Sequence, residues 1–325
     1  MGGEGQRATK VKKTFLVVIL CVLSFGGGWV FHYCYPPAGP PLQTKMIRRW
    51  ALERTLKLRQ ERLSQVVIVK EEDMVGYSRR LLRFRWQKVP LEAYLLVPKK
   101  GKRFAGILAI HGHHTTKEDV VSETQSPFDV NFGVRLVNGG SCVLVPDIPF
   151  ARDLAKEDQI ALNLIMNGNN LMGMRVSYLR TLVDHLSSLS FVDPKRIGCV
   201  GWSMGGGLAL YLSAVDQRIR VVAISSYFGT YRDTVMRRRQ TTDNYIPGIL
   251  NIGEMADVAC LISPRFLWIE GGEQDPEFPT EAFVKGIEGV KNCYRGYERR
   301  LKFELFPGGH RFRGEGIEEW FQRCL

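Results

Sequence analysis

The stretch Gly201-Trp202-Ser203-Met204-Gly205 decides the expected fold of this 325-residue chain. It follows the apolar run 196–200 and precedes the small and apolar residues 206–214, so Ser203 stands on a sharp turn between an expected strand and an expected helix. Such a turn presents the hydroxyl at the carboxyl end of a sheet, where the free N–H groups of the helix start point toward it. Glycine-rich turns without a nucleophile can carry the same letters, so the interpretation depends on partners elsewhere in the chain.

Two candidate partners follow in the order acid, then histidine. Asp275 lies in the loop after the expected strand 266–272, and His310 lies in the loop after the expected strand 301–306. His310 would take the proton of the serine and return it to the leaving group, while Asp275 would fix the tautomer of the imidazole. Glu273, earlier on the same loop, is the alternative acid.

A histidine-rich stretch is the candidate oxyanion loop. The apolar run 104–110 is an expected buried strand, and His111-Gly112-His113-His114 follows it. We expect the backbone amide of Met204 and that of His113 or His114 to form an oxyanion hole. Three histidines in four positions also resemble part of a zinc site, but no carboxylate lies within the next two residues and the cysteines lack ligand spacing. We therefore expect no metal.

Together these motifs resemble an α/β-hydrolase of the dienelactone hydrolase and acetyl xylan esterase-like branch, which borders the prolyl oligopeptidase-like hydrolases. The resemblance covers about residues 66–325 and is carried by residues 110–113, 170–176, 196–206, 257–265, 271–279 and 308–310. It implies a mostly parallel central sheet with helices on both faces. It also implies ester hydrolysis through an acyl-enzyme, with Ser203, Asp275 and His310 as the triad and no cofactor. The branch often has an aspartate near the position of Ser177 or Tyr178, so the natural ester stays open.

The expected substrates are short acyl esters, acetyl groups on glycans being one possibility. A serine peptidase of the prolyl oligopeptidase type and a catalytically silent binding protein on the same scaffold are the alternatives. Residues 226–255 are long enough to cap a substrate pocket, for which Tyr227 and Tyr231 are candidate lining residues. Trp202, beside the serine, is a further candidate, or a brace for the turn.

The coarse order of elements supports an α/β fold. An antiparallel pair over 81–87 and 90–97 is expected to open the domain, and strands then alternate with helices. One mostly helical segment is expected over 162–189, and a closing helix over 314–324. Asp147, at the end of the expected strand 141–146, is interpreted as a structural loop carboxylate.

The N-terminus differs in character from the rest. Residues 14–31 are 18 residues without a charge, and the basic flank 1–13 precedes them. This length is at the threshold for crossing a bilayer, so we expect a transmembrane or signal-anchor helix over 14–35 with the catalytic domain outside the cytoplasm. The alternative is a cleaved signal peptide and a secreted enzyme.

A spacer and a basic helix connect this segment to the catalytic domain. Residues 36–41 are proline-rich, and Met46–Val67 is predicted as an amphipathic basic helix that completes the connecting region 36–65. The helix is expected either to dock on the hydrolase domain, 66–325, or to lie against anionic lipid headgroups.

Charge and cysteines narrow the partners only partly. The net charge of +12 favours attraction to an acidic partner surface, either lipid or polysaccharide. The basic runs are short and lack interleaved aromatic residues, so no nucleic acid is expected. Cys142 and Cys199 lie in expected core strands and are predicted to be buried thiols. A disulfide such as Cys293–Cys324 is compatible with an exported domain. Nothing in the sequence indicates the oligomeric state.

Overall fold

The computed structural model describes residues 42–124, 128 and 130–325. The predicted membrane segment 14–35, the basic flank before it and the proline-rich spacer after it lie outside these residues. Among the described residues, no helix combines the length and the apolar character that crossing a bilayer requires.

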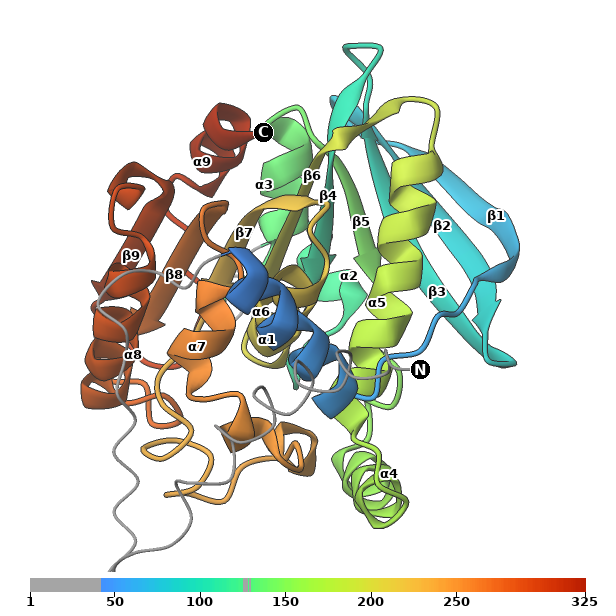
Figure 1. The fold of residues 1–325 in the computed structure, drawn as a ribbon. Coiled ribbons are helices and arrows are strands. Elements are labelled where there is room, and N and C mark those ends of the chain that lie inside the picture. The colour runs from blue at the N-terminus through green and yellow to red at the C-terminus, as the bar shows by residue number, and fades with distance from the viewer. Residues whose placement is uncertain (1–41, 125–127, 129) are drawn as a thin grey trace, which may run out of the picture. The chain divides into compact units, whose positions relative to one another are not determined.

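One sheet of nine strands forms the centre of the described domain, in the order β1-β2-β3-β5-β4-β6-β7-β8-β9 (Figure 1). Along this order, neighbouring strands of the part β5-β4-β6-β7-β8-β9 pair in parallel, and neighbouring strands of the part β1-β2-β3-β5 pair antiparallel. The prediction of a mostly parallel sheet and an opening antiparallel pair is therefore confirmed. The strands are β1 (Ser64–Asp73), β2 (Tyr77–Trp86), β3 (Val89–Pro98), β4 (Phe104–Ile110), β5 (Cys142–Pro146), β6 (Val192–Trp202), β7 (Ile219–Ser225), β8 (Phe266–Gly272) and β9 (Leu301–Phe306).

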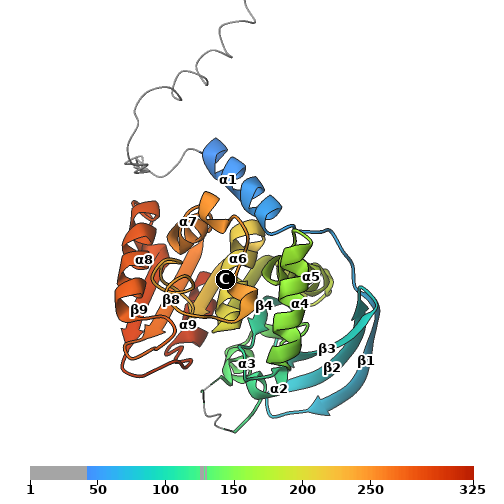
Figure 2. The ribbon, with the colours of Figure 1, turned by 90° about the horizontal axis from the view of Figure 1, so that it is seen from below.

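Helices cover both faces of the sheet. One apolar core joins the sheet to α1, α5, α6, α7 and α8, and a second core joins the other face to α3 and α9. Figure 2 shows α1 outside α5, α6 and α7, as a third layer on that side. The helices are α1 (Leu42–Thr55), α2 (Lys117–Val120), α3 (Phe132–Asn138), α4 (Leu154–Met166), α5 (Leu171–Ser188), α6 (Met204–Val215), α7 (Met255–Cys260), α8 (Thr280–Cys293) and α9 (Ile317–Cys324).

The parallel strands position the loops that carry the predicted site residues. Every residue of β4 and β5 is buried, as expected for strands covered on both faces. Because β4, β6, β7, β8 and β9 run in the same direction, the segments after each of them meet at one edge of the sheet. This edge collects the oxyanion loop, the serine turn, the acid loop and the histidine loop.

The basic helix is shorter than predicted. It begins at Leu42 and ends at Thr55, whereas the sequence predicted a helix over Met46–Val67. Lys57 adopts a left-handed conformation (φ 55°), and the run of β-branched residues 66–69 belongs to β1. Tertiary pairing with β2 and the β preference of that run override the helical spacing of the apolar residues.

The described part of this helix docks on the domain, which was one of its two expected arrangements. Leu52 and Leu56 are completely buried. Arg49 donates to the carbonyl oxygen of Ala214 at 2.9 Å and to that of Leu261 at 3.0 Å. These contacts fix one face of α1 against α6 and the end of α7.

The segment 162–189 is mostly helical, as predicted. It contains the end of α4 and the whole of α5, which are separated because Gly168 has a positive φ of 67° and Asn170 caps α5 by accepting a hydrogen bond from Gly173 N at 2.7 Å. The closing helix begins at Ile317, three residues later than expected.

The cysteine pairing also differs from the example given by the sequence. Cys293 forms a disulfide with Cys260, which links the ends of α7 and α8, with Cα atoms 5.5 Å apart. Cys324 is a free thiol. Cys142 and Cys199 are buried thiols, as predicted, and burial raises the pKa of Cys142 to about 12.

Candidate active site

Ser203 stands on a strained turn between β6 and α6. Its backbone has φ 54° and ψ −124°, a conformation that residues other than glycine rarely adopt and that costs about 1–3 kcal/mol. A Cβ at Gly201 would overlap the carbonyl oxygen of Gly205, and a Cβ at Gly205 would overlap that of Ile110. Glycine is therefore required on both sides of the serine, and the turn presents the hydroxyl at the carboxyl edge of the sheet.

The three predicted triad residues meet at this edge. His310 Nε2 lies 2.8 Å from Ser203 Oγ, and His310 Nδ1 lies 2.8 Å from Asp275 Oδ2. The other carboxylate oxygen of Asp275 accepts the amides of Glu277 at 2.8 Å and Phe278 at 3.1 Å. Asp275 is buried, whereas the alternative acid, Glu273, is exposed. The geometry thus provides an acid, an imidazole and a hydroxyl in one hydrogen-bonded chain.

Aromatic rings hold the imidazole in place. The ring of Trp202 lies 5.4 Å from that of His310, centroid to centroid, and Phe278 lies nearly parallel to it at 6.3 Å. Trp202 is buried and also packs against Gly112 of the oxyanion loop. Its position fits the brace expected as one of its two roles.

A buried carboxylate at the end of β8 fixes the loop that carries the histidine. Glu270 accepts hydrogen bonds from Gly314 N at 3.0 Å, from Arg313 N at 3.2 Å and from Ser225 Oγ at 2.7 Å. Burial raises the pKa of Glu270, although these hydrogen bonds act in the opposite direction. Glu270 is a polar residue in an otherwise apolar strand, a signal that could have marked it in the sequence.

The oxyanion loop follows β4 directly. His114 has a positive φ of 60°, and burial lowers the pKa of His111 to about 4, so that ring is neutral. Within the described residues, no hydrogen bond uses the backbone amides of His113, His114 or Met204. The amide of Met204 and that of His113 or His114 remain the predicted oxyanion donors.

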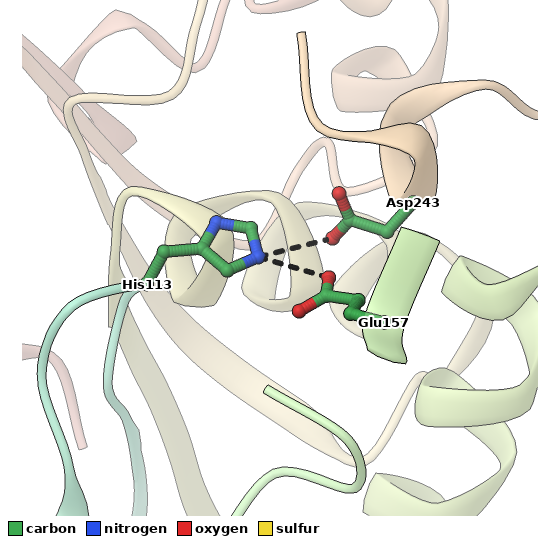
Figure 3. Close-up of side chains that lie close together, drawn as sticks. All are labelled: His113, Glu157 and Asp243. Carbon is green, nitrogen blue, oxygen red and sulfur yellow. Dashed lines mark hydrogen bonds and ion pairs between the residues drawn. The ribbon is translucent and has the colours of Figure 1, made fainter. Parts of the chain in front are cut away.

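The side chain of His113 belongs to a buried cluster of ionisable groups that the sequence did not reveal (Figure 3). His113 Nε2 lies 3.0 Å from Glu157 Oε1 and 3.8 Å from Asp243 Oδ2. Arg175 Nη1 donates to the same two oxygens, at 3.0 and 2.9 Å, and Arg175 Nε donates to the carbonyl of Pro149 at 3.0 Å. The cluster joins the oxyanion loop to α4, to α5 and to the 3-10 turn Thr242–Asn244.

The groups of this cluster shift one another's pKa values. Burial lowers the pKa of His113, but the hydrogen bond to Glu157 and the attraction of Asp243 outweigh it and leave the pKa raised. Burial alone would raise the pKa of Glu157, but the contacts with His113 and Arg175 lower it. For Asp243 burial dominates, and its pKa is raised.

The same cluster is the one group of metal-ligand type found among the described residues, since ligand atoms of His113, Glu157 and Asp243 lie within 4.8 Å of one another. The oxygens that would bind a metal already accept hydrogen bonds from Arg175. A divalent cation would have to displace this buried guanidinium, so the residues present do not fit a metal ion.

The predicted pocket residues have their hydroxyls directed into the core. Tyr227 donates to Asn244 Oδ1 at 2.6 Å, and the hydroxyls of Tyr231 and Tyr211 lie 2.5 Å apart. The segment 226–254, between β7 and α7, nevertheless reaches the acid loop, because Arg238 donates to the carbonyl of Pro276. Whether this segment caps the substrate stays a prediction.

The comparisons with known proteins agree with this architecture. The chain belongs to the dienelactone hydrolase family, whose model matches residues 91–318. The Bacillus subtilis (strain 168) protein provisionally named hydrolase YtaP is 29% identical over 154 residues, which are 43% of this chain and 50% of YtaP. The chain thus covers about half the length of that curated relative.

Solved structures share the fold over most of the chain. BF1801 of Bacteroides fragilis NCTC 9343, provisionally described as an acetyl xylan esterase, has a TM-score of 0.73 at 17% identity and covers 87% of this chain and 88% of its own. A glucuronoyl esterase from Solibacter usitatus has a TM-score of 0.67 at 11% identity and covers 90% and 98%. Identities this low show a common fold and leave the activity open.

Proposed function

We propose that this protein is a serine carboxylesterase that cleaves short acyl esters, with acetyl groups on glycans as one class of substrate. The observation that carries the proposal is the continuous chain from Ser203 through His310 to Asp275, with two contacts of 2.8 Å. A catalytically silent binding protein, the alternative, would have no use for the strained backbone conformation of Ser203. No contact in the described residues favours a peptidase over an esterase.

The geometry suits catalysis through an acyl-enzyme. His310 Nε2 removes the proton of Ser203 while Oγ attacks the carbonyl carbon of the ester, and Asp275 stabilises the imidazolium that forms. The tetrahedral oxyanion is stabilised by the amide of Met204 and by one amide after Gly112. His310 then protonates the leaving alcohol. A water molecule, deprotonated by the same imidazole, attacks the acyl carbon and releases the acid and the free serine.

Support for esters as substrates comes from the family and from the fold. The dienelactone hydrolase family model covers the triad, and structural neighbours include proteins named as acetyl xylan and glucuronoyl esterases. A small-molecule or glycan ester is accordingly the proposed substrate. No cofactor takes part in this chemistry.

We also propose that the catalytic domain works outside the cytoplasm, anchored through residues 14–35, or alternatively is secreted after cleavage of that segment. The Cys260–Cys293 disulfide supports an oxidising compartment, because disulfides seldom persist in a reducing one. The size of the chain isolated from a membrane fraction and from the medium distinguishes the two arrangements.

The proposed activity has a direct test. The full chain should be labelled by a fluorophosphonate probe and should hydrolyse p-nitrophenyl acetate and acetylated xylan, whereas Ser203→Ala should lose labelling and turnover. A prolyl peptide substrate serves as the comparison for peptidase activity. An unlabelled wild-type protein with a normal circular dichroism spectrum would refute the assignment.

A further inference from the structure

The outer face of α1 carries large apolar side chains that the domain leaves in solvent. Met46, Ile47 and Trp50 are 65%, 60% and 57% exposed, and their spacing places them on one side of the helix. The same side continues through the exposed Arg54, whose guanidinium lies 4.8 Å from the centre of the Trp50 ring. An apolar stripe followed by cations is typical of helices that lie in a membrane interface.

A basic groove adjoins this stripe. It has a volume of about 1250 Å³, lies between α1, the segment after it and α5, and is lined by six cations and four carboxylates. Two of the carboxylates, those of Asp184 and Asp216, form ion pairs with one of the cations, Arg218.

Most of the other cations of the groove are unpaired. Arg54, Lys57, Arg59 and Arg180 have no carboxylate within ion-pair distance in the part of the chain that the structure describes. Four unpaired cations around one concave surface attract an anionic ligand.

We propose that the outer face of α1 and this groove form a docking surface for a bilayer that contains anionic phospholipid. Met46, Ile47 and Trp50 enter the headgroup region, and the groove binds phosphate groups. The chain itself places a bilayer within reach, since ten residues, 32–41, separate the apolar run 14–31 from α1. Ten residues span at most about 35 Å, so an inserted run would keep α1 near the membrane surface.

A second copy of the chain is a poorer occupant. Two copies paired through the outer face of α1 would each bring the same cation-lined groove to the contact. Like charges at such a contact oppose association. An anionic surface, by contrast, complements the groove and also accepts the apolar stripe. The proposal does not depend on the ester chemistry.

Limited proteolysis tests the docking. The full chain is reconstituted in vesicles of phosphatidylcholine alone, or with roughly a third phosphatidylglycerol, and trypsin cleavage after Arg59 and Arg62 is followed by mass spectrometry. Because a basic residue at an anionic surface contributes about fivefold to binding, cleavage at these sites should be at least about fivefold slower with the anionic lipid. Cleavage at the remote stretch 237–239 should be the same in both.

Variants separate the two contributions. The triple variant Met46→Ser/Ile47→Ser/Trp50→Ser should lose the protection, and Arg54→Glu/Lys57→Glu should lose most of it. Val75→Ser, at a position 92% exposed, is the matched apolar control, and Lys100→Glu/Lys102→Glu is the matched charge control. Both controls should behave as the wild type. All four variants should keep wild-type turnover of p-nitrophenyl acetate, which shows that they fold.

Three outcomes would overturn the proposal. Equal cleavage with and without anionic lipid would exclude docking through charge. Unchanged protection in the triple variant would exclude the apolar stripe. Protection in detergent that rises with protein concentration would show pairing of two copies of the chain in place of lipid.

Discussion

Two histidines at the same edge of the sheet show how burial separates catalysis from structure. His310 lies between a carboxylate and a hydroxyl and is partly exposed, so it can pass a proton to a reacting group. His113 lies between two carboxylates that share a buried arginine, and its ring has no reacting group beside it. Each of the two histidines thus contacts at least one carboxylate. The third partner and the exposure of the ring distinguish the proposed catalytic histidine from the structural one.

The largest effect is expected from the loss of His310. His310→Ala should lower kcat for p-nitrophenyl acetate by about 10⁵-fold or more, because the general base is lost while the oxyanion amides remain. The thermal unfolding midpoint should change little, since the imidazole is partly exposed. Steady-state kinetics and calorimetry measure both quantities. Turnover near the wild-type level would remove His310 from the role of base.

The acid of the triad should come next. Asp275→Asn should lower kcat by about 10³–10⁴-fold, because the amide favours the wrong tautomer of His310. Glu273→Gln, on the same loop but exposed, is the matched control and should keep most of the activity. If the two variants lost activity equally, the acid would not be assigned to Asp275.

Removing the arginine of the buried cluster should lower the unfolding free energy of the protein. Arg175→Met leaves Glu157 and Asp243 without their shared cation and should cost about 3–5 kcal/mol of unfolding free energy in urea. Arg83→Met removes the more exposed guanidinium of the Arg83–Glu92 pair and should cost below about 1 kcal/mol. Similar losses in the two variants would contradict the distinction drawn from burial.

The smallest effect expected is a pH dependence of stability from His113. Its pKa is raised in the folded protein above the unfolded value of about 6.5, so its contribution is complete below that value and is lost as the pH rises through the folded pKa. The unfolding free energy of the wild type minus that of His113→Gln should therefore decrease from about pH 5 to pH 9. A difference that stays constant, or increases, would refute the raised pKa.

The residues of the predicted triad could be identified from the sequence, whereas the buried cluster around His113 could not. Ser203, Asp275 and His310 each follow a recognisable apolar strand, and parallel strands bring their carboxyl ends together. Arg175, Glu157 and Asp243 come from two helices and a 3-10 turn, whose mutual placement depends on how helices pack across the sheet. No local pattern encodes that placement. It follows that triad geometry was predictable while the support of the oxyanion loop was not.

The errors in the fold have a similar cause. The strand 266–272 matches β8, because a buried strand is a continuous apolar run bounded by turn residues. The strand 301–306 matches β9, in which Leu301, Phe303 and Leu305 alternate with charged residues. The start of the edge strand β1 was taken for the end of a helix, since its residues are exposed and give no alternation. A strand without burial or alternation carries the weakest signal of its structure.

The edge strand β1 has a consequence for solubility. Four β-branched residues in a row, 66–69, are exposed there, at an edge of the sheet where the described residues place no further strand. The pairing of β1 with β2 shifts register twice, between Ser64 and Val67 and between Ile68 and Lys70. Each irregularity interrupts the row of donors and acceptors that an added strand would need, so the open edge is a poor template for aggregation.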